Sequence, residues 1–328
     1  MNVAEASTAL VWGAATAYAI ALVCFTMLLA RQADHVAVRE KVAVGAGSAG
    51  AVSPTTADAG SASDAGVTDD SGAVLASSKA AGIARTTVWA GLALHAGAVV
   101  TRGLAAGRAP WANLYEFMLV GSFVAVIVLL AVQRRKVIPF LGTAVVGIVV
   151  LFLAVAQVNF FVPADGVQPA LQSYWLVIHV GVAVTATGVL TVGFVAAILQ
   201  LLRSSRDAGS PRFAHRRWGW LENTPVPAAL ESLSFRLNAI GFVLWTFTLI
   251  AGAIWAEHSW GRYWGWDPKE VWTFVIWVVY AGYLHARTTR GWAGRRSAWL
   301  VLVAYACVIA NFTLVNIFFP GLHSYANV

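Results

Sequence analysis

The sequence predicts an all-α integral membrane protein, a polytopic bundle of about eight transmembrane helices with an external Trp-rich loop. The first observation is the composition: 59% of the 328 residues are hydrophobic and only 11% are charged. Soluble domains average about 25% charged residues. The second observation is that the apolar residues form stretches of about 17 residues or more, which is long enough to cross a bilayer. The third is that tryptophans are concentrated between two of these stretches.

The apolar stretches give the expected elements in chain order. The first, 8–30, is interpreted as a transmembrane helix and not a cleavable signal, because no basic residue precedes it and it can span a membrane. Residues 31–79 are rich in small and polar residues without an apolar period, which predicts a disordered cytoplasmic linker. Residues 80–328 are expected to form a seven-helix membrane domain, with spans at 83–101, 112–132, 137–157, 173–202, 233–255, 271–287 and 298–319.

The basic residues predict the orientation. When successive loops are assigned to alternate sides, one side receives only Arg102, Arg108, Arg262 and Lys269, and the rest of the 22 basic residues fall on the other. Cytoplasmic loops carry the excess of Lys and Arg. Both termini and the Trp-rich loop are therefore expected outside the cytoplasm, in a multi-pass protein of the plasma membrane. This topology accounts for the net charge of +7. The sequence has no basic face with base-reading residues, so nucleic-acid binding is not expected.

The Trp-rich segment carries more aromatic residues than a membrane-surface loop requires. Five of the fifteen tryptophans fall between Trp255 and Trp272, around the run Trp260-Gly261-Arg262-Tyr263-Trp264-Gly265-Trp266-Asp267-Pro268-Lys269-Glu270. Loops at a membrane surface usually carry one or two Trp as interfacial anchors. A shelf of large flat side chains suits a large flat ligand. The run also contains a helix start, because Asp267 can cap a helix and Glu270 completes a capping box.

Two of the seven histidines approach the same membrane face as the tryptophans. His179 lies about two turns into the outer end of span 173–202, and His323 follows span 298–319. Ionisable groups inside a membrane are costly and tend to mark function, although a single histidine is often only hydrogen-bonded to a neighbouring helix. Two neutral imidazoles on either side of a flat aromatic plane suit a six-coordinate haem iron. Zinc would require three or four clustered ligands, which the outer face lacks.

The run from Trp260 to Glu270 resembles the tryptophan-rich WWD signature of the haem-handling proteins of cytochrome c biogenesis, most closely the CcsA/ResC branch of system II. The resemblance covers most of residues 83–323, so the seven-helix domain is expected to handle haem, with the WWD loop at 256–270. The sequence departs from the family at Glu257-His258-Ser259, and the roles of His258 and of His95 stay open. Three further stretches carry the resemblance: Pro110-x-x-Asn113-Leu114-Tyr115-Glu116, Trp175-Leu176-x-x-His179 and Tyr283-Leu284-His285-Ala286-Arg287.

The resemblance implies a ligand, a site and partners. In the family, two external histidines ligate haem iron, and a third histidine within the membrane binds haem in transit. By position, the resemblance implies that His179 and His323 are the external pair and that His285 is the third. The family also implies haem b as the ligand handled, a separate CcsB/ResB-like membrane partner, and apocytochrome c as the acceptor. The residues expected to bind haem besides the two external histidines are Trp260, Gly261, Arg262, Trp264, Trp266, Asp267, Lys269 and His285.

The expected function is the haem-handling subunit of a cytochrome c synthase complex, a haem lyase. Haem would be presented at the outer face for thioether attachment to a C-x-x-C-H segment of apocytochrome c, so the substrate supplies the nucleophilic thiols. Arg262 or Lys269, with Arg102 or Arg108, could pair with the haem propionates. A haem exporter or chaperone without ligation activity remains an alternative. A cytochrome b-like electron-transfer subunit is less favoured, because no predicted span contains two histidines.

Overall fold

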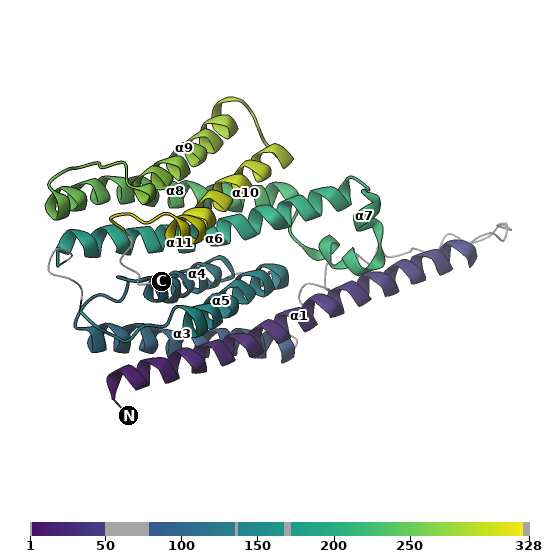
Figure 1. Ribbon diagram of the computed structural model, residues 1–328. Helices are drawn as coiled ribbons and strands as arrows, with labels where there is room; N and C mark the ends of the chain where they lie inside the picture. The colour runs from purple at the N-terminus through teal and green to yellow at the C-terminus, as the bar shows by residue number, and fades with distance from the viewer. Residues whose placement is uncertain (1, 50–78, 135–136, 167–171, 324–328) are drawn as a thin grey trace.

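The computed structural model describes residues 2–49, 79–134, 137–166 and 172–323, and this part of the chain is helical, without strands. Figure 1 shows long helices packed side by side along one axis, with α6 between a group at the bottom of the view and a group at the top. The bottom group is α1 Val3–Ala49, α3 Lys79–Ala106, α4 Leu114–Val132 and α5 Pro139–Asn159. α6 is Tyr174–Asp207, and the top group is α8 Pro227–Trp260, α9 Pro268–Thr289 and α10 Arg295–Ala310.

Every predicted span coincides with a helix or, for the last one, with a continuous helical segment, apart from one or two residues at the ends of some spans. This segment consists of α10, a π-helical turn (η3, Asn311–Val315) and α11 (Asn316–Phe318). In the described residues, seven helices are long and apolar enough to cross a membrane, which confirms an all-α polytopic membrane protein. α9 is the one predicted span that is not among them. It is a helix of 22 residues, but its charged ends and its Trp and Tyr residues make it less apolar.

The first helix is longer than the sequence indicated. α1 continues to Ala49, so residues 31–49, predicted as the start of a disordered linker, are helical. Between residues 31 and 44 the chain has no Gly or Pro and contains Ala, Gln, Arg, Glu and Lys, which have favourable helix propensities. A composition argument for disorder overlooked this local preference. The rest of the predicted linker, 50–78, lies outside the described residues.

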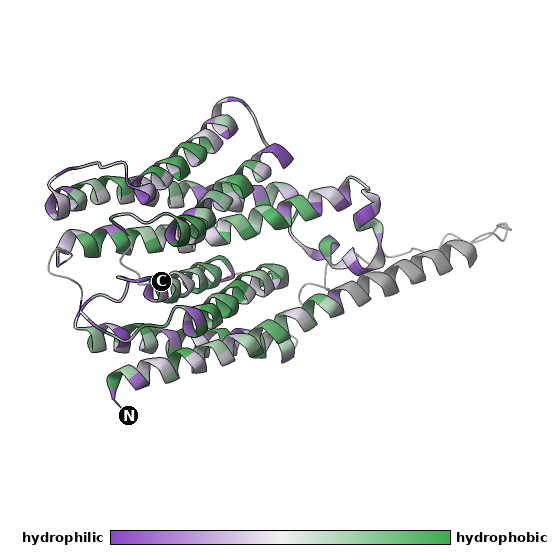
Figure 2. Cartoon of the chain, in the orientation of Figure 1, coloured by the Kyte–Doolittle hydropathy of each residue, from purple (hydrophilic) through white to green (hydrophobic). Residues whose placement is uncertain are grey.

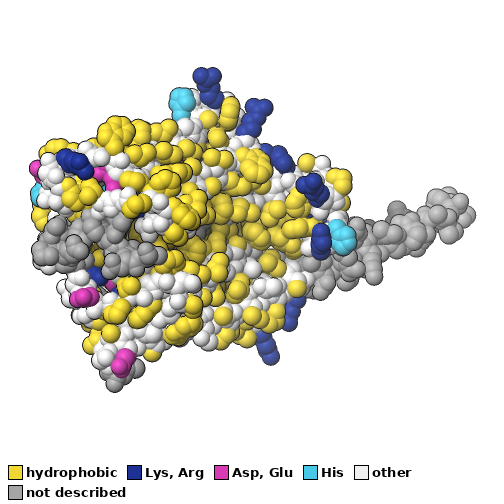
Figure 3. Space-filling view, viewed as in Figure 1, with side chains coloured by type: hydrophobic (Ala, Val, Ile, Leu, Met, Phe, Trp, Pro, Cys, Tyr) yellow, Lys and Arg dark blue, Asp and Glu magenta, His cyan; other side chains and the backbone are white. Residues whose placement is uncertain are grey.

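The two ends of the bundle differ in charge. In Figure 1 the start of α1 and the connection between α8 and α9 lie at the left end. The right end carries the connection between α9 and α10, the short helix α7 (Pro211–Ala214) and the 3₁₀ helix η2 (Arg216–Asn223). Figure 2 shows hydrophobic residues along the helices and hydrophilic ones mostly towards the ends and connections. In Figure 3 most Lys and Arg side chains lie on the right half of the visible face, and the acidic ones on the left.

The central helix α6 belongs to both parts of the core. One cluster of buried apolar side chains joins α1, α3, α4 and α5 to α6, and a second joins α6 to α8, α9 and α10. α6 is accordingly the most buried of the seven candidate spans. The first turns of α6 lie at the end of the bundle where α8 and α9 connect. His179 lies in these turns.

Candidate functional site

A pocket lies at this end of the bundle, and it brings together segments distant in sequence. Its free space is ≈ 1360 Å³, counted out to its open mouth. The walls come from α4, α6, α8, the first turns of α9, the end of α10 with η3, and the connections on either side. His179, His323, Trp255 and Trp264 all line it. Mostly apolar and aromatic walls with a few polar groups are typical of ligand sites.

The His179 ring is held by α8. Its Nδ1 lies 2.9 Å from the backbone carbonyl oxygen of Thr248. A carbonyl oxygen only accepts, so Nδ1 carries the proton and Nε2 keeps its lone pair in the neutral ring. The ring stacks on Trp255, with centroids 5.8 Å apart and an interplanar angle of 11°. Gly252 makes room for it, because a Cβ there would lie 2.7 Å from His179 Cε1.

The His323 ring is held by the Trp-rich loop. Its Nδ1 lies 2.7 Å from Asp267 Oδ2, so Nδ1–H donates to the carboxylate and Nε2 is again the nitrogen with the lone pair. The ring also meets Trp255 and Trp260 edge to face, with centroids 5.5 and 5.1 Å apart. Histidines that ligate metals typically donate the other ring N–H to a carboxylate or a backbone carbonyl, which fixes the tautomer and the orientation. Both His179 and His323 have this arrangement.

Asp267 connects the start of α9 to the chain after α11. It caps α9 by accepting from the backbone N–H of Lys269 at 3.1 Å, and the predicted capping box with Glu270 is present. It also accepts from the backbone N–H of Leu322 at 2.5 Å and from His323. Burial by itself would raise the pKa of Asp267. The contact with His323 and the two backbone N–H bonds outweigh burial and hold this pKa below its ordinary value.

Some predicted residues of the Trp-rich loop line the pocket or contact its histidines, and others do neither. Trp264 lines the pocket, and Trp260 contacts His323 and Trp255. Gly261 ends α8 in the left-handed conformation with φ 68° and is not among the lining residues. Trp266 also lies outside the lining and is 77% exposed. Its φ of 58° makes it the one non-glycine residue with positive φ in the described chain, a conformation that costs energy for a bulky side chain.

The outer basic residues have different surroundings. Lys269 lines the pocket, and its Nζ donates to the backbone carbonyl of Asn311 at 3.0 Å, in the π-helical turn. Arg262 is exposed and lies over Gly265, where a Cβ would be 2.6 Å from the guanidinium carbon. Arg102 and Arg108 form ion pairs with Glu116 at 2.9 and 2.7 Å. Of these four residues, Lys269 is the one that the described structure places in the pocket wall.

The other predicted or open histidines are not among the residues that line the pocket. His285 is exposed in the last two turns of α9, towards the opposite end of the bundle. His95 is fully buried, with Nε2 2.9 Å from the Leu119 carbonyl oxygen and Nδ1 3.3 Å from the Tyr18 hydroxyl, which gives it a structural role. His258 is exposed and pairs with Glu257 at 3.3 Å.

Three residues of the site had not been assigned to it from the sequence. Trp255 contacts both histidine rings, Thr248 fixes the His179 ring through its backbone carbonyl, and Trp111 lines the pocket. Trp255 had a signal in the sequence, since it is the first of the five clustered tryptophans. Thr248 had none, because any residue could supply that carbonyl.

Comparisons with known proteins give the family and the fold. The family model described as Cytochrome C assembly protein matches residues 111–323. The chain is 34% identical over 250 residues to a cytochrome c biogenesis protein CcsA of Prochlorococcus marinus, covering 69% of this chain and 78% of the relative. It is 33% identical over 270 residues to a CcsA of a Synechococcus species, covering 76% and 89%.

One solved structure resembles the whole fold. That protein is named Cytochrome c Heme Lyase CcmF, and it aligns with a TM-score of 0.61 at 16% identity. The alignment covers 96% of this chain and 47% of the other, so this chain spans about half the length of that one. At this identity the likeness concerns the fold alone.

Proposed function

The chain belongs to the cytochrome c assembly protein family, as a member of CcsA type, and on this premise we propose that it is the haem-handling subunit of a cytochrome c synthase complex. It binds haem b in the pocket beneath the Trp-rich loop, with His179 and His323 as the iron ligands. There it presents the haem for thioether attachment to the C-x-x-C-H segment of an apocytochrome c. A CcsB/ResB-like membrane protein completes the complex.

The observation that carries this proposal is that the two histidines line one pocket with the same hydrogen-bonding arrangement. Each donates Nδ1–H to a fixed acceptor, Thr248 or Asp267, and each keeps its Nε2 lone pair at the same aromatic pocket. Haem iron with two axial imidazoles requires such a pair. The fit extends to the walls, because the indoles of Trp255 and Trp264 provide the large apolar contact that a porphyrin needs.

The role of this chain in the reaction is positioning. The two histidines and the indoles fix the plane of the haem, and the apocytochrome brings the two thiols to the vinyl groups. Holding two reactants in the reacting geometry lowers the entropic part of the barrier without a nucleophile from the protein. Ligation by two neutral imidazoles in a mostly apolar pocket also tunes the redox state of the iron.

We also propose that the pocket opens on the extracytoplasmic side. The basic residues at the opposite end support this orientation under the rule that cytoplasmic loops are rich in Lys and Arg. Both termini and the WWD loop then lie outside, which is the side on which cytochromes c are assembled in the proposed reaction.

Reconstitution tests the function. The purified chain is combined with its CcsB/ResB-like partner, reduced haem and an apocytochrome c, and covalent haem is measured on the denatured product. The proposal predicts haem attached through thioether bonds. Haem that binds and moves across the membrane without any covalent product would make the chain an exporter or chaperone, and absence of haem binding would contradict both functions.

Lys269 is proposed to pair with a haem propionate. Lys269→Ala is expected to lower haem affinity by about tenfold or more, because a charge-assisted hydrogen bond at a partly buried site is lost. Haem titration of the purified chain measures this. Arg262→Ala is the matched control, since Arg262 is exposed outside the pocket, and is expected to bind as the wild type does. If Lys269→Ala kept wild-type haem occupancy and wild-type cytochrome c maturation, the proposed pairing of Lys269 with a propionate would be contradicted.

His285 is proposed to bind haem on its way from the inner side. His285→Ala is expected to lower the haem content of protein purified from cells, because delivery to the pocket is impaired. Haem added to the purified variant should still bind with wild-type affinity and spectrum, since His285 lies away from the pocket. His215→Ala, an exposed histidine just before η2, is the control. An unchanged haem content in His285→Ala would contradict the transit role.

A further inference from the structure

The stretch from Pro110 to Glu116 forms part of the same pocket. Residues 111–113, in the connection between α3 and α4, and Leu114, the first residue of α4, line it together with the Trp-rich loop. The Trp111 ring packs against α6, because a Cβ at Gly181 would lie 3.2 Å from Trp111 Cζ2. Gly181 follows His179 by two residues, so Trp111 contacts the helical turn that carries this histidine. Trp111 Nε1 is buried and lacks a hydrogen-bond partner among the described residues.

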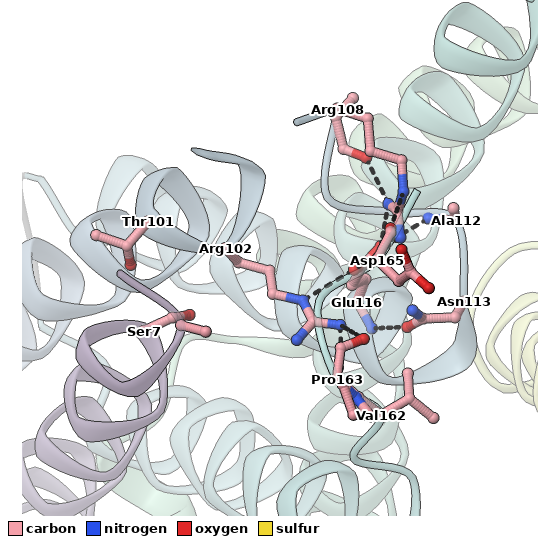
Figure 4. Close-up of polar contacts among 12 residues, drawn as sticks. Ser7, Thr101, Arg102, Arg108, Ala112, Asn113, Glu116, Val162, Pro163 and Asp165 are labelled. Carbon is pink, nitrogen blue, oxygen red and sulfur yellow. Dashed lines mark hydrogen bonds and ion pairs between the residues drawn. The ribbon is translucent and has the colours of Figure 1, made fainter. Parts of the chain in front are cut away.

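A buried carboxylate fixes this connection. Glu116 is 0% exposed, and Figure 4 shows it beside the guanidinium groups of Arg102 and Arg108. Its Oε1 accepts from Arg102 Nε at 2.9 Å and from Arg108 Nη2 at 3.2 Å. Its Oε2 accepts from Arg108 Nη1 at 2.7 Å and from the backbone N–H of Ala112 at 2.9 Å. The last bond ties the carboxylate to the residue next to Trp111.

The two arginines extend the network to the chain that follows α5. Arg102 Nη2 donates to the Val162 carbonyl oxygen at 2.9 Å, and Arg108 Nε donates to that of Asp165 at 3.0 Å. α3, α4 and both connections are thus joined at one point (Figure 4). A buried ion network contributes little to stability once its desolvation is counted. Its effect here is on position, because each oxygen of Glu116 has two donors, and the segment 111–114 is tied to this fixed carboxylate through the Ala112 N–H.

We propose that residues 111–114 are a ligand-contacting wall of the pocket, in which Trp111 contacts the porphyrin and Glu116 is the positioning residue that sets Trp111. This inference rests on the proposed haem binding. The indole supplies apolar area against the macrocycle. Its unpartnered N–H gains an acceptor when a ligand with carboxylates fills the pocket, which would account for an otherwise costly buried donor.

Binding of metal-free protoporphyrin IX tests the wall separately from the iron ligands. The purified chain is titrated with the porphyrin, and affinity is read from fluorescence. Trp111→Ala is expected to bind about tenfold more weakly. Trp89→Ala, which removes an exposed indole on α3 outside this pocket, should bind as the wild type does. If Trp111→Ala binds the porphyrin as tightly as the wild type does, residues 111–114 are not a ligand-contacting wall. If the wild-type chain binds neither haem nor porphyrin, the proposed function itself is contradicted.

A double-mutant cycle tests Glu116. Glu116→Gln is expected to weaken porphyrin binding, and the double variant with Trp111→Ala should bind no more weakly than Trp111→Ala alone, because Glu116 acts through Trp111. Glu231→Gln is the matched control, since Glu231 is also buried and paired with an arginine, Arg287, at the other end of the bundle. Additive losses in the double variant overturn the positioning role. Arg108→Lys, which keeps the charge and loses the two-point contact, repeats the test if Glu116→Gln does not fold.

Discussion

Replacing either His179 or His323 with Ala is expected to abolish two-imidazole ligation of haem iron and to reduce cytochrome c maturation to background. Each histidine supplies one axial position in the proposed site, and no other described histidine lines the pocket. Burial of the porphyrin among indoles remains in each variant, so weak haem binding through one ligand can persist. The measurements are the haem content of the purified variants and covalent cytochrome c formed in cells that depend on them.

Two controls separate ligation from folding. His258→Ala changes an exposed histidine at the same end of the bundle and should leave both readouts unchanged. In His179→Gly and His323→Gly, added imidazole should restore haem binding, because it can occupy the vacated ligand position. If either Ala variant matured cytochrome c at the wild-type rate, that histidine would not be an iron ligand.

Asp267→Asn is expected to have the next largest effect, a loss of about ten- to hundredfold in haem affinity. The carboxylate accepts His323 Nδ1–H, holds the Leu322 backbone and caps α9. An amide of the same shape keeps the cap but removes the charge that orients the imidazole. Haem titration of the purified variant measures the loss. Asp207→Asn, which breaks a pair with Arg203 outside the pocket, is the control and should bind haem normally.

The pH dependence of this contact follows from the lowered pKa of Asp267. A carboxylate with a depressed pKa in the folded state contributes stability above its unfolded pKa, and this contribution is lost as pH falls through the folded value. The contacts of Asp267 hold its pKa below the ordinary range of a carboxyl, and that range already lies below pH 5. Protonation of Asp267 therefore should not weaken haem binding between pH 7 and pH 5. Wild-type haem affinity in Asp267→Asn would show that the orientation of His323 does not depend on the carboxylate.

Much of the fold could be predicted because length and hydrophobicity are local properties. The spans and the capping box at Asp267 each depend on residues adjacent in sequence, and both are present in the structure. The extension of α1 to Ala49 and the more polar α9 were the exceptions. In residues 31–49 the average composition indicated a linker, whereas the local helix propensity favours the helix that is present. In α9 the apolar residues indicated a span, whereas its charged, Trp and Tyr residues lower its mean hydropathy.

The site was predictable in its residue types and not in its contacts. His179, His323 and Trp264 were named from the sequence, and the structure places all three in one pocket. The bond from His323 to Asp267 joins residues 56 positions apart. Trp266 looked equivalent to Trp264 in the sequence. In the structure Trp264 lines the pocket, whereas Trp266, which has a positive φ, does not. Such differences arise from tertiary packing, which spacing along the chain does not encode.

Low-temperature electron paramagnetic resonance of the ferric haem complex tests the central claim most directly. The account predicts a low-spin signal typical of two axial imidazoles in the wild-type chain, and its conversion to a high-spin signal or its loss in both His179→Ala and His323→Ala. A high-spin wild-type signal, or a low-spin signal that survives both substitutions unchanged, would contradict ligation of the iron by these two histidines.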